Sequence, residues 1–246
     1  RPGSNPISYN QEIKKISPIL KTLPKNEFLI SVDTNKIETQ EFALQHGAHI
    51  INDIFGGSED LFNLSKKYQN GLILMHTPAA PKNMQKKTGI YKHVIQDIIK
   101  IFKQKIKHID IARIPRRKVW FDPGIGFGKN LKQNLQIIKN IKKFKFKNCG
   151  LLVGLSRKRF IAELSKKEDP INRISGTIAA NQFALDQGAD IIRVHDVNKT
   201  YKMLKIINRT KTIRGNLISQ RLLPRNQNDL FPSPPDYQIS IQDAKN

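Results

Sequence analysis

The sequence predicts an α/β fold in which parallel strands alternate with helices. Short, almost continuously apolar runs recur along the chain, as expected when both faces of a parallel strand are covered. Stretches of amphipathic helical pattern separate these runs. Residues 43–54, "ALQHGAHIINDI", are echoed by residues 184–197, "ALDQGADIIRVHDV", so a helix–glycine–strand unit recurs. These observations leave two topologies, an open doubly wound sheet and a closed (β/α)8 barrel.

Six strands and seven helices are expected in alternation. The strands are predicted at residues 28–33, 48–53, 71–76, 118–123, 150–156 and 190–196. The helices are predicted at residues 8–22, 36–46, 58–69, 90–110, 130–146, 172–187 and 198–212. Thr34 or Asn35 can begin the helix after the first strand, and Gly47, Gly71 and Gly188 lie where helices give way to strands.

The chain is expected to contain one domain, residues 1–213, and an extension, residues 214–246. A closed barrel needs eight βα units, and the opening "RPGS" reads as a loop that should follow a strand. About six of the eight units are therefore expected here, with one or two N-terminal units absent. Residues 214–246 contain four prolines and no hydrophobic period, which predicts a poorly ordered extension.

The composition is strongly basic. The chain has 43 Lys and Arg against 20 Asp and Glu, a formal charge of +23. A basic balance of this size is typical of polyanion binders, but the lysines are scattered and few aromatic residues interleave with them. We therefore expect a solvated basic surface and no nucleic-acid partner.

The cysteine count and the hydropathy indicate in which cellular compartment the protein is expected. Cys149 is the single cysteine, which excludes an internal disulfide and a cysteine-built metal site. Apolar runs stay well below the ~20 residues of a membrane span, so no membrane association is expected. A reducing, cytoplasmic location is the natural expectation.

Residues 121–130, "FDPGIGFGKN", resemble a phosphate-binding loop at first sight. A P-loop would need glycine where Pro123 stands and a hydroxyl residue where Asn130 stands, so that pattern fails. The dinucleotide pattern also fails, because Gly124, Gly126 and Gly128 are evenly spaced by two. We interpret the segment as a ligand loop at a strand end, with Lys129 as a helix-start residue.

Polar side chains end every predicted strand. They are Asp33, Asn52 with Asp53, His76, Asp122, Ser156–Lys158, and Arg193 with His195. The carboxyl ends of parallel strands meet on one face, where ligands bind. Carboxylates and an amide come from the early strands and cations from the last two, a set that suits a ligand with an N–H-rich heterocycle at one end and phosphate at the other.

Any one of these residues alone has an ordinary structural explanation. An Asp after a strand is often only a helix cap, which we favour for Asp53, and a lone histidine such as His76 is more often an interior residue than a catalyst. His76, His195 and Asp53 are not spaced as a known metal site.

With these motifs together, residues 1–212 resemble dihydropteroate synthases, enzymes of folate synthesis. The matching segments are "RPGS" (1–4), "SVDTNK" (31–36), "GAHIINDI" (47–54), "LMH" (74–76), "PKNMQ" (81–85), "FDPGIGFGKN" (121–130), "LLVGLSRKRFI" (151–161), "SGT" (175–177) and "GADIIRVHDV" (188–197). The resemblance implies a (β/α)8 (TIM) barrel. It also implies the condensation of 6-hydroxymethyl-7,8-dihydropterin pyrophosphate with p-aminobenzoate, which releases pyrophosphate.

The resemblance also implies a role for each matching residue. The pterin would be bound by Asp33, Asn52, Asp122, Lys158, Met75 and Phe127. The pyrophosphate would be bound by Arg193 and His195, and the p-aminobenzoate side would be formed by Arg1, Pro2, Ser156 and Arg157. No residue would form a covalent intermediate, since in this family pyrophosphate departs first and the arylamine then attacks the pterin methylene.

A metal and a partner follow only from the resemblance. Mg²⁺ would be held mainly by the substrate pyrophosphate, and the family's Asn ligand would lie before residue 1, so this chain would supply no metal ligand. A homodimer is implied. Thr77-Pro78-Ala79 departs from the family's Met-x-Gly pattern after the third strand.

Three alternative functions stay open at this point. A pterin-binding methyltransferase domain would share the strand-end Asp and Asn residues, but it would not need the cations of "SRKRF" and "RVHDV". A non-catalytic relative of the synthase would be expected to have lost part of the polar set. A nucleic-acid binder would be driven by the positive charge.

Overall fold

The computed structural model describes residues 7–25, 27–78, 91–165, 169–213 and 238–241. The strands are β1 (Ser31–Asp33), β2 (Ile50–Asp53), β3 (Gly71–Met75), β4 (Val119–Asp122), β5 (Gly150–Gly154), β6 (Ile191–Val194) and β7 (Gln238–Ile241). The α-helices are α1 (Tyr9–Thr22), α2 (Ile37–Gln45), α3 (Glu59–Tyr68), α5 (Val94–Ile111), α6 (Leu131–Lys139), α7 (Arg159–Leu164), α8 (Ile174–Asp186) and α9 (Val197–Ile213). Short 3-10 turns are η2 (Arg116–Lys118), η3 (Ile141–Phe144) and η4 (Pro170–Asn172).

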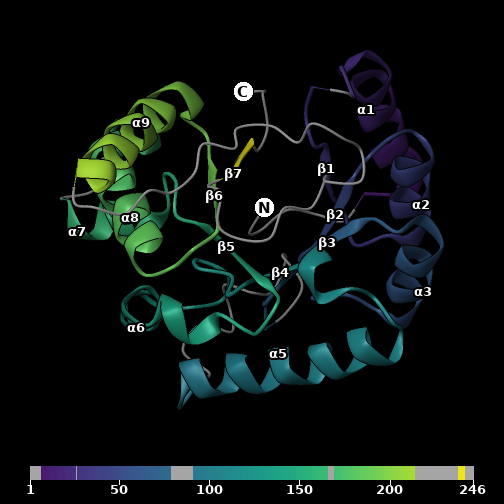
Figure 1. The fold of residues 1–246 in the computed structure, drawn as a ribbon, viewed down its shortest axis with the longest axis horizontal. Helices are drawn as coiled ribbons and strands as arrows, with labels where there is room; N and C mark the ends of the chain where they lie inside the picture. The colour runs from purple at the N-terminus through teal and green to yellow at the C-terminus, as the bar shows by residue number, and fades with distance from the viewer. Residues whose placement is uncertain (1–6, 26, 79–90, 166–168, 214–237, 242–246) are drawn as a thin grey trace.

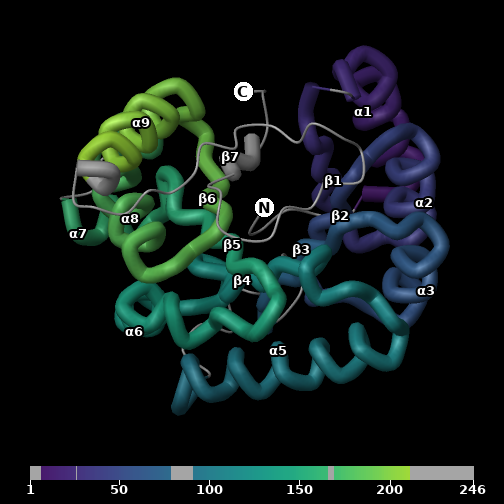
Figure 2. The backbone as a smooth tube through the Cα atoms, viewed as in Figure 1, coloured from purple at the N-terminus to yellow at the C-terminus, as the bar shows by residue number. Residues whose placement is uncertain are grey.

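All pairings in the sheet are parallel, and the strands follow one another in chain order from β1 to β7. The sheet curls and the helices surround its outer side (Figure 1). The tube in Figure 2 shows β1 and β6 on opposite sides of the curl. Within the described residues β1 and β7 are the edges of the sheet. Consecutive parallel strands inside a ring of helices are the architecture of a (β/α)8 barrel, so the predicted fold class is confirmed.

The predicted strands each contain an observed strand, but two helical predictions are corrected. The helix expected over residues 130–146 ends at Lys139, and the tighter turn η3 follows. That turn buries Ile141 and Phe144, three positions apart, which matches the 3-10 period. Helix α7 was not predicted, because its six residues are too short to show a helical period.

The extension forms one short strand. Residues 214–237 and 242–246 lie outside the described residues, so the prediction of poor order is untested there. Residues 238–241 form β7 and pair with β6, a strand that the sequence analysis did not predict. The alternation Gln-Ile-Ser-Ile is a four-residue strand signal, and its pairing covers the side of β6 that faces away from β5.

Two apolar clusters form the core. The larger lies between the sheet and the helices and includes Ile51, Leu74 and Phe121. The smaller lies on the inner face of the curl and consists of Ile50, Ile73, Trp120, Leu152 and Ile191, one from each of β2 to β6. Strand side chains alternate between faces, so each residue two positions further on also points inward.

Trp120 depends on a glycine in the next strand. Trp120 pairs in register with Gly150, and a Cβ placed on Gly150 would lie 2.0 Å from the indole Cδ1. Gly150 therefore makes room for the one large aromatic side chain of the inner cluster, in the way that large and small residues alternate inside barrels.

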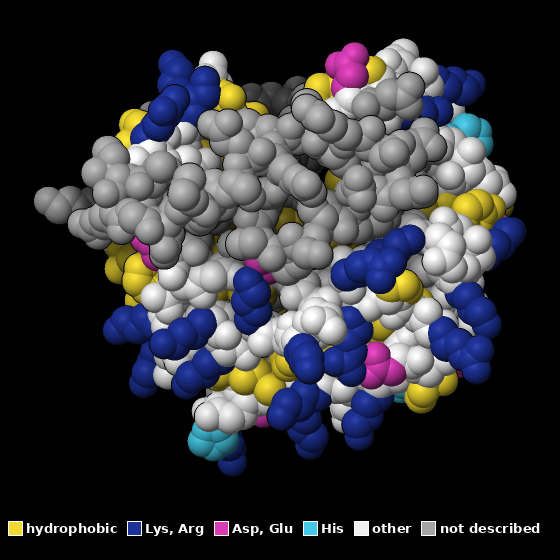
Figure 3. Space-filling view, in the orientation of Figure 1, with side chains coloured by type: hydrophobic (Ala, Val, Ile, Leu, Met, Phe, Trp, Pro, Cys, Tyr) yellow, Lys and Arg dark blue, Asp and Glu magenta, His cyan; other side chains and the backbone are white. Residues whose placement is uncertain are grey.

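The surface is rich in cations without a single dense patch on the face shown in Figure 3. Lys and Arg side chains are scattered there among other residues. The described helices also include none with an apolar stretch long enough to cross a bilayer.

Replacing Gly150 by Ala is expected to lower the free energy of unfolding by about 1–3 kcal/mol, because the added methyl group must displace the Trp120 indole. Urea unfolding followed by circular dichroism measures this loss. Gly154→Ala is the matched control, since its added Cβ would meet only the Cβ of Arg193 at 3.8 Å. Equal stability of the two variants would contradict the packing argument.

Candidate active site

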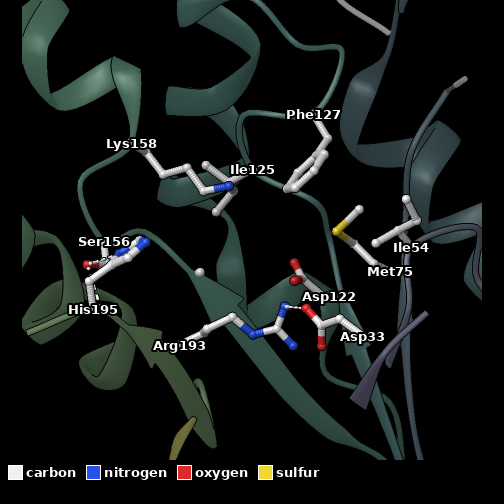
Figure 4. A pocket seen from close by; sticks show the side chains of 11 residues that line it. Asp33, Ile54, Met75, Asp122, Ile125, Phe127, Ser156, Lys158, Arg193 and His195 are labelled. Carbon is white, nitrogen blue, oxygen red and sulfur yellow. Dashed lines mark hydrogen bonds and ion pairs between the residues drawn. The ribbon is translucent and has the colours of Figure 1, made fainter. Parts of the chain in front are cut away.

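A pocket opens at the carboxyl end of the strands, directly above the inner apolar cluster. Its lining consists of Asp33, Ile54, Met75, Asp122, Ile125, Phe127, Gly154, Ser156, Lys158, Arg193 and His195 (Figure 4). The strand period explains how the sequence builds it. Met75, Asp122 and Arg193 each lie two positions after an inner-cluster residue and share its face.

Asp122 is the buried acid of this pocket. It is only 4% exposed, and its Oδ1 accepts a hydrogen bond from the Gly124 backbone N–H at 2.8 Å. Burial raises the pKa of Asp122, and the charges of Arg193 and Lys158 oppose that rise. Its carboxyl group faces the open centre of the pocket (Figure 4), so it can accept hydrogen bonds from a ligand.

Arg193 and Asp33 meet across the mouth of the pocket. The Nη1 of Arg193 donates to the Oδ2 of Asp33 at 3.3 Å, which connects β6 with β1 (Figure 4). Nη2 of Arg193 is buried and has no hydrogen-bond partner among the described residues. A buried guanidinium with a spare donor can bind an anion such as a phosphate group.

Lys158 brings a second cation from the loop that precedes α7. Its Nζ lies 4.2 Å from the centre of the Phe127 ring, a cation–π distance. Burial lowers the pKa of Lys158 to about 8, and the charge of Asp122 opposes this shift. Lys158 is therefore charged below about pH 8 and loses its charge above it.

Ser156 and His195 form a bonded pair at the edge of the pocket. Ser156 Oγ accepts from the His195 backbone N–H at 3.2 Å and lies 3.0 Å from His195 Nδ1 (Figure 4). Ser156 is buried, so this contact sets the direction of the imidazole. Ser156 thus contacts His195, and its predicted place beside p-aminobenzoate stays a prediction.

Asn52 and Arg157 are not among the pocket-lining residues. Asn52 is fully buried on the inner face, beside Asp33 in the strand register, and both of its amide atoms lack partners among the described residues. A buried amide in that state suits a ligand that supplies the hydrogen bonds. Arg157 instead makes two hydrogen bonds to Asp196, at 3.0 and 2.8 Å, and this pair lowers the pKa of Asp196.

Other predicted residues have clear positions. Asp53 accepts from the Phe55 N–H at 2.7 Å and so stabilises the turn after β2, whereas Ser58 caps α3, so the helix-cap prediction for Asp53 is wrong. His76 is buried with its Nε2 3.3 Å from the Tyr91 hydroxyl, and burial lowers its pKa to about 3. Arg1 and Pro2 lie outside the described residues.

The sequence interpretation missed three lining residues and misjudged one lysine. Ile54, Ile125 and Gly154 line the pocket and continue the motifs "IINDI", "FDPGI" and "LLVG", so their position beside the polar residues was the available signal. The assignment of Lys129 as a helix-start residue is wrong. Asn130 caps α6, whereas the Lys129 side chain turns inward and is 4% exposed.

The described residues do not build a metal site of their own. No group of three or more His, Cys, Asp and Glu side chains gathers among them. Two basic side chains, Arg193 and His195, line the pocket instead. Basic side chains suit an anion, whereas Mg²⁺ prefers oxygen ligands.

Comparison with known proteins gives a consistent result. Residues 1–195 match the family model described as "Pterin binding enzyme". The dihydropteroate synthase of Escherichia coli is 37% identical over 219 residues, which is 88% of this chain and 77% of that protein. The dihydropteroate synthase of Streptococcus pyogenes is 33% identical over 211 residues, 84% of this chain and 76% of that protein.

Solved structures agree with these sequence relatives. The Thermus thermophilus dihydropteroate synthase in complex with 4-aminobenzoate superposes with a TM-score of 0.79 and 33% identity, covering 85% of this chain and 80% of that one. The same enzyme in complex with 6HMPPP gives a TM-score of 0.77 over 83% of this chain and 81% of that one, also at 33% identity. The chain therefore belongs to the pterin-binding enzyme family, and within it to the dihydropteroate synthases.

Proposed function

We propose that this chain condenses 6-hydroxymethyl-7,8-dihydropterin pyrophosphate with p-aminobenzoate to give 7,8-dihydropteroate and pyrophosphate. The observation that carries the proposal is the placing of one buried carboxyl group and three basic side chains in the same pocket. Asp122 lies at the centre of this set, with Lys158, Arg193 and His195 around it. Relatives with this reaction in their names, and structures named with both substrate types, support the assignment.

The two ends of the pterin substrate suit the two kinds of group. Asp122 can accept two N–H groups from the edge of the pterin ring, while Asn52 and Asp33 lie on the neighbouring strands β2 and β1. Met75, Phe127 and Ile125 supply apolar surface for the ring. Arg193 and His195 then face the pyrophosphate.

The reaction needs no covalent attachment to the protein. The bond between the pterin methylene carbon and the pyrophosphate oxygen breaks, and its electron pair leaves with pyrophosphate. The amine of p-aminobenzoate donates its lone pair to the methylene carbon, and the new C–N bond forms as the nitrogen loses a proton. Cationic Arg193 and Lys158 stabilise the negative charge that develops on the leaving group.

The alternatives are less well supported by the pocket. In a methyl-group transfer from a folate, the transferred group would not bind the spare donor of Arg193. A pyrophosphate would bind it. A non-catalytic relative is disfavoured because Asp33, Asp122, Lys158, Arg193 and His195 all line one pocket. Mg²⁺ remains a proposal, in which the ion arrives on the substrate pyrophosphate. A cytoplasmic location is part of the same proposal and rests on the single free cysteine, Cys149.

A homodimer through helices α8 and α9 is also proposed. Between them runs a groove lined by Ile174, Ser175, Ile178, Ala179, Gln182, Lys199, Lys202, Met203 and Ile206. Large apolar side chains of these two helices are exposed, including Ile206 of the groove at 66% and Phe183 of α8 at 42%. A second copy of the chain would cover this apolar area, and the resemblance to the synthases supports that occupant.

Asp122→Asn is expected to weaken binding of the pterin pyrophosphate by at least ~1.5 kcal/mol, roughly tenfold, because the amide replaces one of the two acceptor oxygens by an NH2 donor. Isothermal titration calorimetry measures the change. Asp110→Asn is the matched control, since Asp110 pairs with Arg116 on an exposed helix end and should leave binding unchanged. Unchanged affinity in the Asp122 variant would remove Asp122 from the pterin site.

Arg193→Met is expected to weaken binding of the pyrophosphate substrate about tenfold or more, and to change binding of the same pterin without pyrophosphate much less. The reason is that Arg193 lines the pocket and its buried Nη2 has a donor to spare for an anion. Competition binding experiments measure the affinity of each variant for the pterin pyrophosphate and for the pterin without pyrophosphate. Arg116→Met, which removes an exposed ion pair with Asp110, serves as the control. Equal losses for the two ligands would place Arg193 at the ring instead.

Ile206→Glu is expected to convert the dimer into a monomer, because a carboxylate would be placed in the apolar contact between two copies. Size-exclusion chromatography with light scattering measures the mass. Ile111→Glu makes the same change at a side chain that is 79% exposed at the end of α5, outside the groove, and should leave the mass unchanged. A monomeric wild-type chain would contradict the proposed dimer directly.

A further inference from the structure

Lys129 is a buried cation whose side chain does not line the pocket. It follows the glycine loop between β4 and α6 and is 4% exposed. Its Nζ donates to the backbone carbonyls of Gly124 at 2.8 Å, Phe127 at 3.0 Å and His76 at 3.4 Å. An ammonium group has three N–H donors, so these three carbonyls use all of them.

The three carbonyls belong to two different segments of the chain. His76 follows β3, whereas Gly124 and Phe127 lie in the loop after β4. Gly124 has a φ of +66°, and a Cβ added there would lie 1.9 Å from the His76 carbonyl oxygen. The close approach of the two segments therefore requires glycine, and the ammonium group stabilises the carbonyl oxygens that this approach brings together.

A second residue fixes the same loop from the side of α6. Asn134 accepts from the Gly126 N–H at 2.8 Å and donates to the Lys129 carbonyl at 3.1 Å. The loop is thus bonded on its inner side by the Lys129 ammonium and on its helix side by the Asn134 amide. Of the pocket residues, Asp122 lies immediately before this loop, and Ile125 and Phe127 lie within it.

We propose that Lys129 is a positioning residue for the pterin site, because its ammonium holds the loop that presents Asp122 and Phe127 to the substrate. This inference rests on the proposed function. Lys129 acts through the backbone carbonyls of His76, Gly124 and Phe127 and not by touching the ligand. Its positive charge also favours the ionised form of Asp122, whose pKa it lowers against the effect of burial.

The charge of Lys129 makes the proposed arrangement sensitive to pH. Burial lowers the pKa of Lys129 to about 7, with Asp122 opposing the shift and Lys158 adding to it. The imidazole of His76, the residue that follows β3, is neutral near pH 7 because its pKa is about 3. As pH rises through about 7, Lys129 loses a proton, and a neutral amine can donate to only two of the three carbonyls.

The first test replaces the ammonium by an apolar group of similar length. Lys129→Met is expected to weaken binding of the pterin pyrophosphate roughly tenfold or more, since the charged hydrogen bonds are lost. Lys132→Met is the matched control, because Lys132 is exposed on α6 three positions further along. Lys129→Arg, which keeps a positive charge at every accessible pH, is expected to restore part of the affinity.

The second test follows the titration of Lys129 and does not depend on the folding of Lys129→Met. Binding is measured as the pH rises through 7 and beyond in Lys158→Met, which removes the pocket lysine whose pKa is also lowered, with the ligand's own titration recorded separately. Affinity is expected to fall at a pH above 7, because loss of the Lys158 charge raises the pKa of Lys129, and in the double variant Lys129→Arg/Lys158→Met the fall should disappear. A flat profile in Lys158→Met would overturn the proposal.

The two proposals fail in different ways. A wild-type chain that binds no pterin pyrophosphate would refute the proposed function itself. A wild-type chain that binds it, together with a folded Lys129→Met variant of equal affinity and equal pH profile, would refute only the role of Lys129. Thermal unfolding of each variant identifies folded protein before binding is measured.

Discussion

The pocket depends on keeping the buried carboxyl group of Asp122 ionised, so that it can accept hydrogen bonds. Asp122 is buried at the end of β4, and an isolated charge in such a place costs several kcal/mol unless other groups compensate. The fold compensates with cations that arrive from separate elements. Arg193 comes from β6, Lys158 from the loop before α7, and Lys129 from the loop after β4. Most of the polar arrangement around the pocket follows from this one requirement.

The layered interior of the curled sheet explains why these groups face each other. A floor of apolar side chains, one from each of five strands, fills the inside of the curl. On each strand, the residue two positions after this floor also points inward and is the first to reach the mouth of the pocket. Trp120 and Asp122 illustrate the relation, since they lie two positions apart on β4, one in the floor and one in the pocket. The alternation of side chains along each strand therefore places both the apolar cluster inside the curl and the polar residues of the pocket above it.

Much of the fold and site could be predicted because both depend on short-range patterns. Six apolar runs identified the strands, and the polar residue after each run identified Asp33, Asp122 and Arg193 as neighbours in space. The direction of long side chains could not be predicted in this way. Arg157 turns to Asp196, which is 39 positions away in the sequence. Lys129 turns towards carbonyls of its own loop and of His76, and the folded path of the backbone decides that direction. The short strand β7 was missed because its four-residue alternation lies in a segment that otherwise contains prolines and no hydrophobic period.

The ion pair between Asp33 and Arg193 has a consequence for how the protein folds. Its two residues are 160 positions apart and belong to β1 and β6. Contacts of such long range form late, because the chain must first lose the entropy of closing a large loop. A partly folded chain therefore has strands and helices before it has a pocket. Ligand that binds only the finished pocket would favour the complete fold over such intermediates by mass action, and acquisition of binding would mark the last step of folding.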